Sequence, residues 1–288
     1  MIQISGMPFQ QSDAWPKGSI ESDIIQRMQD DSAVYLYKSI DELTFEIKLR
    51  KNIIEGAIVM DQGDAEFASF EKSYCNPEYW NLTYVGGFQL RSDVKPSEAI
   101  LDIYKNSSLY AYECSTGMII IYYYAVLRSI GEHLFNQLFQ NIYLYSWHSD
   151  SDLGIHSIHS DHFIPGDVVY FQNPDVDPEM SWWRGENAVD LGDGTFFGHG
   201  LGINNAVDMI NALNEKRKPG SIQSAYLTNS VARPSFKHLA HLSKIQRSYS
   251  AYKFQHFVIH HNESSISFYK YLQYLKMFYH QMTNMNPI

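Results

Sequence analysis

The chain has little cysteine, with only Cys75 and Cys114 among its 288 residues. Two cysteines exclude a multi-disulfide framework, and the absence of a CxxC pair removes the usual zinc-knuckle signature. A free thiol fits a reducing compartment. Residues 1–12 agree with this, because they show no basic region followed by an apolar stretch. We therefore expect a protein that is not secreted by a signal peptide.

Long apolar runs and excess positive charge are also missing. The longest apolar run, Met118 to Leu127, has about half of the ~20 residues that a membrane-spanning helix needs. The net charge is −10, whereas phosphate binding needs clustered Lys and Arg. We expect no membrane and no nucleic acid among the partners of this chain.

Histidines and acidic residues gather in one stretch, but without metal-site spacing. The group consists of His148, Asp150, Asp152, His156, His159, Asp161 and His162. Their spacing matches no standard zinc signature, and the stretch is typical of a polar loop. The sequence predicts no metal and no cofactor.

Aromatic residues, in contrast, are abundant. They make up 15% of the chain and include 21 Tyr, in a composition that is 44% hydrophobic and 19% charged. This excess is typical either of a Tyr-rich core and surface or of an apolar channel or interaction surface, and both alternatives stay open.

Hydrophobic periodicity and turn signals predict the elements. Ser39-Ile40-Asp41-Glu42 is a capping box, and Gly192-Asp193-Gly194 is a hairpin signal. We expect helices at 22–31, 40–54, 96–105, 118–130, 132–139 and 204–218. We expect strands at 33–37, 80–90 (with an irregularity at Gly86-Gly87), 109–112, 142–147, 168–172, 186–191, 195–199 and 224–231. A buried helix that follows a cysteine and precedes an antiparallel meander predicts an α+β fold.

Cys114 is the candidate nucleophile, because it precedes an almost wholly apolar helix in the polar stretch Glu113-Cys114-Ser115-Thr116. Unpaired amides and a partial positive charge at a helix start favour a thiolate, and the amides of Cys114 and Ser115 are candidates to hold an oxyanion. The alternative interpretation is that Cys114 is only a small, buried, apolar side chain without a catalytic role. Cys75 lies in a turn-like setting and is the weaker candidate.

Glu186 and His199 are the candidate acid/base partners, since they flank the predicted hairpin and we expect them to face one site. Proton transfer from a thiol near pKa 8.5 to a carboxylate near 4.3 is uphill by about 5.7 kcal/mol. A Glu186 base therefore requires burial to raise its pKa, the helix start to lower that of the thiol, or His199 to relay the proton. Glu113 either orients or deprotonates an incoming amine or caps the helix.

These candidates lie in stretches that resemble one known family. The stretches are Glu113-Cys114-Ser115-Thr116, residues 182–188, residues 193–200 and Tyr226-Leu227-Thr228-Asn229. In order and spacing they resemble the protein-glutamine γ-glutamyltransferases of Bacillus-type spore coats, over about residues 1–242. The stretch 165–171 also resembles the strand after the catalytic helix in NlpC-type cysteine peptidases, where Glu186 stands in the place of their His.

The resemblance implies a papain-like, NlpC-type core whose catalytic Cys114 begins a buried helix packed on an antiparallel sheet. It implies calcium-independent cross-linking of spore coat proteins through ε-(γ-glutamyl)lysine bonds, with Glu186 as principal partner, His199 in support, and a tunnel crossing the protein. Trp147, Trp182 and Trp183 are expected to form apolar walls and, with Asn187, to bind substrate. The enzyme would be a monomer made in the mother-cell cytoplasm and then located in the spore coat.

The resemblance covers a single catalytic domain at residues 1–243 and leaves residues 244–288 as a C-terminal extension. We expect this extension to be disordered or loosely packed, with a helix at Ser265 to Met282, although a docking segment is the alternative. An NlpC-type peptidase or amidase and a catalytically silent coat protein remain the competing functions.

Overall fold

The structure, a computed structural model, describes residues 1–10, 15–244, 253 and 257–285. The α-helices are α1 (Ile20–Asp30), α2 (Ile40–Asp61), α3 (Pro96–Lys105), α4 (Cys114–Ile130), α5 (Glu132–Leu138), α6 (Ala206–Asn214), α7 (Phe236–Leu242) and α8 (Phe268–Met285). Short 3-10 helices lie at η1 (Phe70–Lys72), η2 (Ser107–Leu109), η3 (Ser151–Leu153) and η4 (Pro178–Trp183). No described helix has the length and apolar character that crossing a membrane requires.

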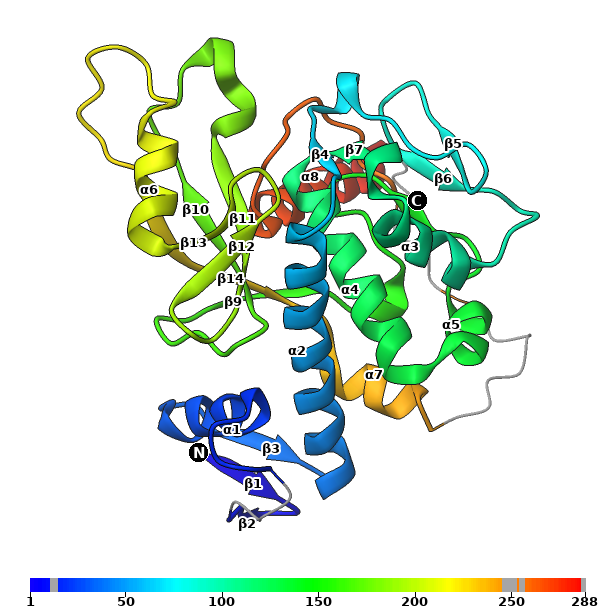
Figure 1. The fold of residues 1–288 in the computed structure, drawn as a ribbon, viewed down its shortest axis with the longest axis vertical. Coiled ribbons are helices and arrows are strands. Elements are labelled where there is room, and N and C mark those ends of the chain that lie inside the picture. The colour runs from blue at the N-terminus through cyan, green and yellow to red at the C-terminus, as the bar shows by residue number, and fades with distance from the viewer. Residues whose placement is uncertain (11–14, 245–252, 254–256, 286–288) are drawn as a thin grey trace.

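The main sheet has six antiparallel strands in the order β13-β12-β11-β10-β14-β9. These are β9 (His156–His159), β10 (Val168–Gln172), β11 (Gly185–Asp190), β12 (Thr195–Gly198), β13 (Gly202–Asn205) and β14 (Tyr226–Arg233). Figure 1 shows α2 running between this sheet and the helices α3, α4 and α5. Alternate residues of β10 face the two sides: Val168 packs in the main core, and Val169 packs with Met209 of α6. The architecture is α+β, as predicted.

Smaller sheets complete the fold. They pair β1 (Ile2–Ile4) with β2 (Met7–Pro8) and β3 (Tyr35–Tyr37), β4 (Glu66–Phe67) with β7 (Ala111–Tyr112), and β6 (Phe88–Leu90) with β5 (Trp80–Leu82) and β8 (Tyr143–Leu144). The single strand predicted at 80–90 is wrong, because the chain reverses at Gly86, whose φ is +84°. Most other predicted elements are present with shifted ends, and α3 and β10 have the predicted ends.

Helix α4 is the buried helix that the sequence predicts. Every residue from Cys114 to Leu127 except Tyr124 is buried, because nearly every position is apolar and can pack against α2 on one side and α3 and α5 on the other. Gly131 ends the helix at φ +81°, a conformation that suits glycine.

A buried ion cluster joins the helix layer to the sheet. Asp167 lies 2.8 Å from Arg50 of α2 and 2.5 Å from Arg233 of β14, and its carboxylate also accepts from the Ile164 amide. The two guanidinium groups hold the pKa of Asp167 below its usual value against the opposing effect of burial. The cluster fixes α2, and with it the neighbouring α4, against the sheet.

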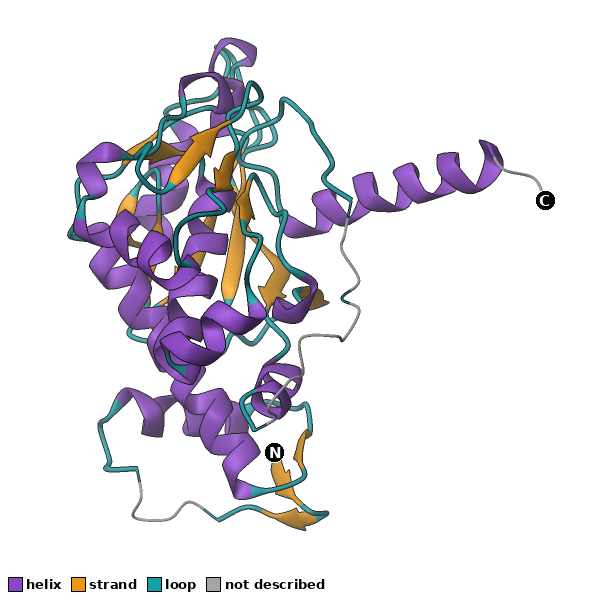
Figure 2. Cartoon of the chain, turned by 90° about the vertical axis from the view of Figure 1, so that its right-hand side faces the viewer, coloured by secondary structure: helices purple, strands orange, loops and turns teal. Residues whose placement is uncertain are grey.

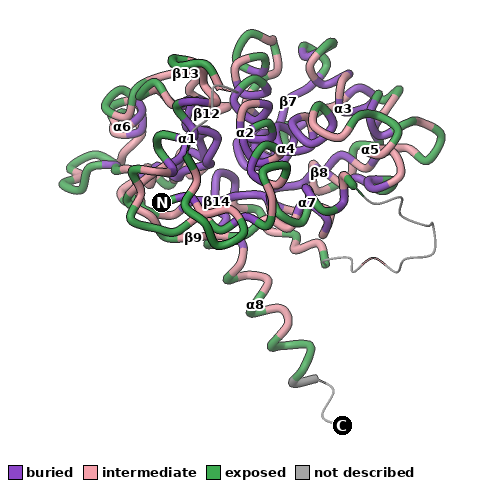
Figure 3. The backbone as a smooth tube through the Cα atoms, turned by 90° about the horizontal axis from the view of Figure 1, so that it is seen from below, coloured by how far each residue is buried: buried purple, intermediate pink, exposed green. Residues whose placement is uncertain are grey.

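The C-terminal residues pack against the body where they begin and leave it afterwards. Ser264, Ser265 and Ile266 are buried, as are Phe268 and Tyr271 in the first turn of α8. The rest of α8 projects from the body, as Figures 2 and 3 show. The expectation of loose packing is therefore wrong for residues 264–271, and the helix runs from Phe268 to Met285. Residues 245–252, which the same expectation covered, lie outside the described residues.

Candidate active site

Cys114 is the first residue of α4 and is fully buried. Glu113 is the N-cap: its carboxylate accepts from the amides of Ser115 (3.1 Å) and Thr116 (2.8 Å), from both of their hydroxyls, and from the Ser265 amide (3.0 Å). With its lone pairs engaged in this way, Glu113 acts as a cap rather than as a free base. The prediction that the Ser115 amide is unpaired and ready for an oxyanion is wrong.

The thiol is not held as an anion in this structure. Burial raises the pKa of Cys114 well above its ordinary value, and the carboxyl groups of Glu186 and Glu113 raise it further. The helix start was expected to have the opposite effect, but its amides are occupied by Glu113. Asn187 donates from Nδ2 to Cys114 Sγ at 3.3 Å. The resting thiol is therefore neutral and shielded.

Glu186 lies in β11 and is fully buried. Burial raises its pKa to about 8, and the charge of Glu113 contributes, while the Gly200 amide, 3.2 Å from Oε1, partly opposes the shift. Oε2 makes no hydrogen bond to any described residue. Of the three routes that would allow a glutamate to act as base, the raised carboxyl pKa is the one present.

Two glycines, Gly198 and Gly200, face the side chain of Glu186 and leave little room for a side chain of their own. A Cβ at Gly198 would lie 2.7 Å from Cγ of Glu186 and 2.8 Å from its Oε1. A Cβ at Gly200 would lie 3.3 Å from Oε2 and 3.1 Å from the Trp183 ring. The hairpin of β11 and β12 thus leaves a slot that fits this carboxyl group.

His199 lies near the start of α4 but is not arranged as a proton relay. Its ring stacks on Tyr112 at 4.3 Å, and Nε2 donates to the Glu66 carbonyl at 3.2 Å. Burial lowers its pKa to about 4, so the imidazole is neutral. No hydrogen bond joins it to Cys114 or Glu186 within the described chain. The geometry favours a positioning role for His199.

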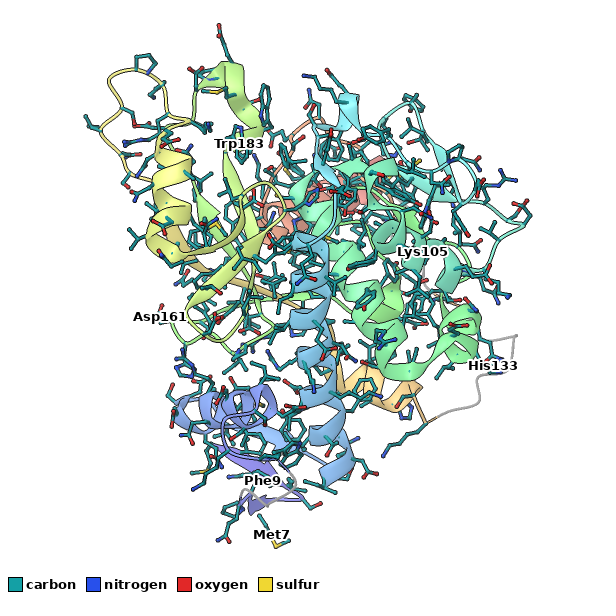
Figure 4. The ribbon with its side chains drawn as sticks, in the orientation of Figure 1. Met7, Phe9, Lys105, His133, Asp161 and Trp183 are labelled. Carbon is teal, nitrogen blue, oxygen red and sulfur yellow. The ribbon has the colours of Figure 1, made fainter. Side chains whose placement is uncertain are left out.

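The three tryptophans occupy different positions. Trp147 is buried and donates from Nε1 to the Ile266 carbonyl at 2.9 Å. Trp183, labelled in Figure 4, stacks on Phe67 at 5.1 Å. Trp182 lines a cavity of about 510 Å³ that Phe67 and Ser264 also line. Trp147 is thus linked to Cys114 through Ile266 and Asn187, whereas Trp182 faces the cavity.

The C-terminal segment covers Cys114, and no local pattern in the sequence predicts this. The Ile266 carbonyl accepts from Trp147 Nε1 and from Asn187 Nδ2, each at 2.9 Å. Tyr170 donates to the Ser265 carbonyl at 3.1 Å. Tyr170, Ser265 and Ile266 were not among the predicted site residues. Their places depend on contacts between positions 79 to 119 residues apart, which helix or strand periodicity cannot reveal.

The histidine and aspartate stretch does not form a metal site. Within the described residues no group of His, Cys, Asp and Glu is placed to hold a metal ion. Part of the predicted loop is strand β9, whose register pairs His159 with Ser230. Asp150 and Asp152 instead bind the Lys253 ammonium at 2.5 and 2.9 Å.

Comparisons with known proteins agree on one family. The family model for protein-glutamine gamma-glutamyltransferase matches residues 1–243. A protein of that name from Halalkalibacterium halodurans is 51% identical over 275 residues, covering 96% of this chain and 97% of its own. One from Bacillus mycoides is 43% identical over 226 residues, covering 78% of this chain and 82% of its own.

A solved structure gives the same result. A transglutaminase from Geobacillus stearothermophilus, described as lacking its C-terminal extension, superimposes with a TM-score of 0.69 at 47% identity, over 72% of this chain and all of that one. Because the Halalkalibacterium alignment spans 275 residues and the family match ends at residue 243, that alignment reaches into the C-terminal segment. The chain belongs to the protein-glutamine γ-glutamyltransferase family and is a transglutaminase.

Proposed function

We propose that the chain transfers the γ-glutamyl group of a protein-bound glutamine to a lysine amine through a thioester on Cys114. The observation that carries this proposal is a buried thiol at the start of α4 within the electrostatic reach of a buried carboxyl group whose pKa is about 8. In the first step Cys114 Sγ attacks the carboxamide carbon while Glu186 takes the thiol proton. The C–N bond then breaks, and ammonia leaves after gaining that proton.

Two side chains are placed to hold the reacting carbonyl. Trp147 Nε1 and Asn187 Nδ2 already donate to one carbonyl oxygen at 2.9 Å, and the same Asn187 nitrogen is 3.3 Å from Cys114 Sγ. We assign them to the oxygen of the glutamine carboxamide, where two N–H donors stabilise the charge of the tetrahedral intermediate. They take the role that was expected of the backbone amides of Cys114 and Ser115.

The second step consumes the thioester. A lysine amine attacks the acyl carbon, Glu186 accepts a proton from that amine, and the thiol is restored as the isopeptide bond forms. Water competes for the same thioester, so enclosure favours transfer over hydrolysis. The aromatic walls at Phe67, Trp182 and Trp183 supply that enclosure on one side.

The finer assignments are part of the same proposal. The substrates are spore coat proteins, the reaction needs no calcium, and the enzyme acts as a monomer that is made in the mother cell and joins the coat. The mechanism uses a thiol and a carboxyl group, and neither step requires a metal ion. This supports activity in the presence of a chelator.

Incubation with a glutamine-containing protein and a fluorescent primary amine, with a calcium chelator present, tests the proposal. We expect the amine to become covalently attached to the protein, and we expect no attachment with Cys114→Ala. A Cys75→Ala variant is the matched control and retains activity. Ammonia release without amine attachment would instead support an NlpC-type amidase.

A further inference from the structure

We infer that residues 263–271, here called the strap, are an autoinhibitory segment that occupies the acyl-donor position and must leave before Cys114 can react. The inference rests on the proposed thioester chemistry, because it takes its meaning from where the substrate carbonyl must lie. It gives the C-terminal segment a function: regulation of the site that it covers.

The Ile266 carbonyl of the strap lies where the carbonyl of a substrate would have to bind. The Ile266 carbonyl oxygen lies between Trp147 Nε1 and Asn187 Nδ2, at 2.9 Å from each, and Asn187 Nδ2 also contacts the nucleophilic sulfur. A glutamine carboxamide oxygen needs the same two donors beside the same sulfur. The two carbonyls therefore compete for one place.

The strap also closes the approaches to the thiol. Ser264 lines the cavity of about 510 Å³ that Phe67 and Trp182 border, and Ser267 lines a second cavity of about 470 Å³ that Tyr170 borders. The two residues between them, Ser265 and Ile266, are fully buried, and so is Cys114. Departure of the strap would expose the thiol between the two cavities, one for each substrate of a transfer reaction.

The contacts that hold the strap are reversible ones. Glu263 pairs with Arg184 at 3.3 Å and with Lys270, and Tyr274 donates to it at 2.6 Å. The ring of Phe268 meets that of Trp147 at 5.1 Å. No disulfide holds the segment, since Cys75 and Cys114 are both free, so its position is an equilibrium that sequence changes can shift.

The backbone of the strap is strained at the point of closest approach. Ser265 has φ +58°, a left-handed conformation that is uncommon for a residue other than glycine. Its amide donates to Glu113, and its carbonyl accepts from Tyr170. Those two bonds hold a conformation that an unattached segment would not keep. Beyond Tyr271, α8 carries exposed apolar side chains such as Met277 and projects into solvent (Figures 2 and 3).

Alkylation of the native full-length protein by iodoacetamide tests the inference, with each cysteine followed by peptide mass spectrometry. The double variant Phe268→Ala/Tyr271→Ala removes the buried side chains of the strap. We expect its Cys114 to react at least about tenfold faster than in the unmodified chain. Met277→Ala, a change at an exposed position of the same helix, should leave the rate unaltered. Cys75 reports general unfolding, and its rate should not change.

Ser265→Pro is a second, independent way to release the strap, because proline cannot adopt φ +58°. It should give the same rise in Cys114 alkylation with Cys75 unaltered. Equal Cys114 rates in the unmodified chain and in both strap variants would overturn the inference.

Amine incorporation by the same proteins separates this inference from the proposed function. Faster alkylation together with faster incorporation supports both. Faster alkylation without any incorporation would support the autoinhibitory role of the strap and contradict the proposed transfer reaction. Equal incorporation by the unmodified chain and the released variants would contradict the autoinhibitory role and support the transfer reaction.

Discussion

Glu186 determines how the thiol of Cys114 can be activated. An ordinary carboxylate is too weak a base for a thiol, but a buried one with a pKa of about 8 brings the two groups much closer in proton affinity. Burial also raises the pKa of the thiol, which offsets part of this gain. The closed site is therefore largely protonated at both groups at pH 7, and only the ionised fraction of Glu186, which grows as pH rises toward 8, can take the thiol proton.

Substitutions at three of the predicted catalytic positions should differ in severity. Cys114→Ala removes the nucleophile and should abolish amine incorporation. Glu186→Gln removes the base and should lower kcat by about 10²–10⁴-fold. His199→Ala removes a stacked, neutral ring and should cost roughly tenfold, because it disturbs positions rather than proton transfer. Steady-state incorporation assays compare them, and equal losses for Glu186→Gln and His199→Ala would show that the base is wrongly assigned.

The raised pKa of Glu186 also predicts a pH dependence of stability. Its pKa is about 8 in the folded chain and about 4.5 when unfolded. Between these values the folded state binds more protons at Glu186, so the contribution of this group to stability is greatest below pH 4.5 and is lost as pH rises through 8. The loss between pH 5 and pH 8 should be about 3 kcal/mol.

Glu186→Gln isolates this effect, since it keeps the shape of a neutral carboxyl group. Urea unfolding at pH 5 and pH 8 should show the variant gaining stability relative to the unmodified chain as pH rises. Parallel curves for the two proteins would contradict the raised pKa. With the raised pKa, Glu186→Gln should be much less active and, at pH 8, more stable than the unmodified chain, a common relation at active sites.

Gly198 should tolerate no side chain. Gly198→Ala would place Cβ within 3 Å of two atoms of Glu186, so the carboxyl group must move. We expect kcat to fall by about 10²-fold while the fold is retained. Gly194→Ala in the same hairpin is the contrasting variant, because its Cβ meets open space although its φ is +90°. Its activity should be near that of the unmodified chain, and a near-normal rate for Gly198→Ala would show that Glu186 need not be held in this place.

Local patterns in the sequence found Cys114 and Glu186 but not their protonation. The polar stretch before an apolar helix marks Cys114, and the hairpin glycines mark the strand that carries Glu186. The environment of both groups depends on burial by residues from several distant elements. The helix start alone therefore favours an ionised thiol, whereas Glu113 takes up the helix amides and Asn187 links the sulfur to the Ile266 carbonyl.

At the scale of elements, α2 is held to the sheet by the buried ion cluster of Asp167. Asp167→Asn would leave Arg233 buried without its carboxylate partner, and Arg50 would keep Glu46 as its partner. We expect a loss of about 3–5 kcal/mol in the free energy of unfolding. Urea denaturation measures it, with Glu55→Gln on the outer side of α2 as control. A loss no larger than that of the control would mean that the cluster contributes little to the packing of α2.

Element prediction succeeded where the signal is local. Pro96 at the start of α3 and the apolar run of β10 fix those elements with the predicted ends. It failed at residues 80–90, where the turn at Gly86 makes two short strands of one. Strand β13 and helix α7 were not predicted, since each is short and gains its stability from packing on larger elements.

At the scale of the whole molecule, the aromatic excess has two locations. Tyr122 and Tyr123 of α4 lie in the core, whereas Phe67 and Trp183 stack beside the site. The interpretation as a Tyr-rich core is confirmed for Tyr122 and Tyr123, and the apolar channel stays a prediction. The C-terminal segment was the least predictable part, because its buried residues contact helix α4, strand β11 and Trp147 rather than their own neighbours in sequence.

The most direct test of the central claim is the mass of the enzyme after reaction with a glutamine peptide in the absence of amine. The Phe268→Ala/Tyr271→Ala variant is the suitable protein, since its thiol is expected to be accessible. The account predicts an acyl group on Cys114 alone, with loss of one ammonia, that an added amine removes. An acyl group on another residue, or ammonia release that persists in Cys114→Ala, would contradict it.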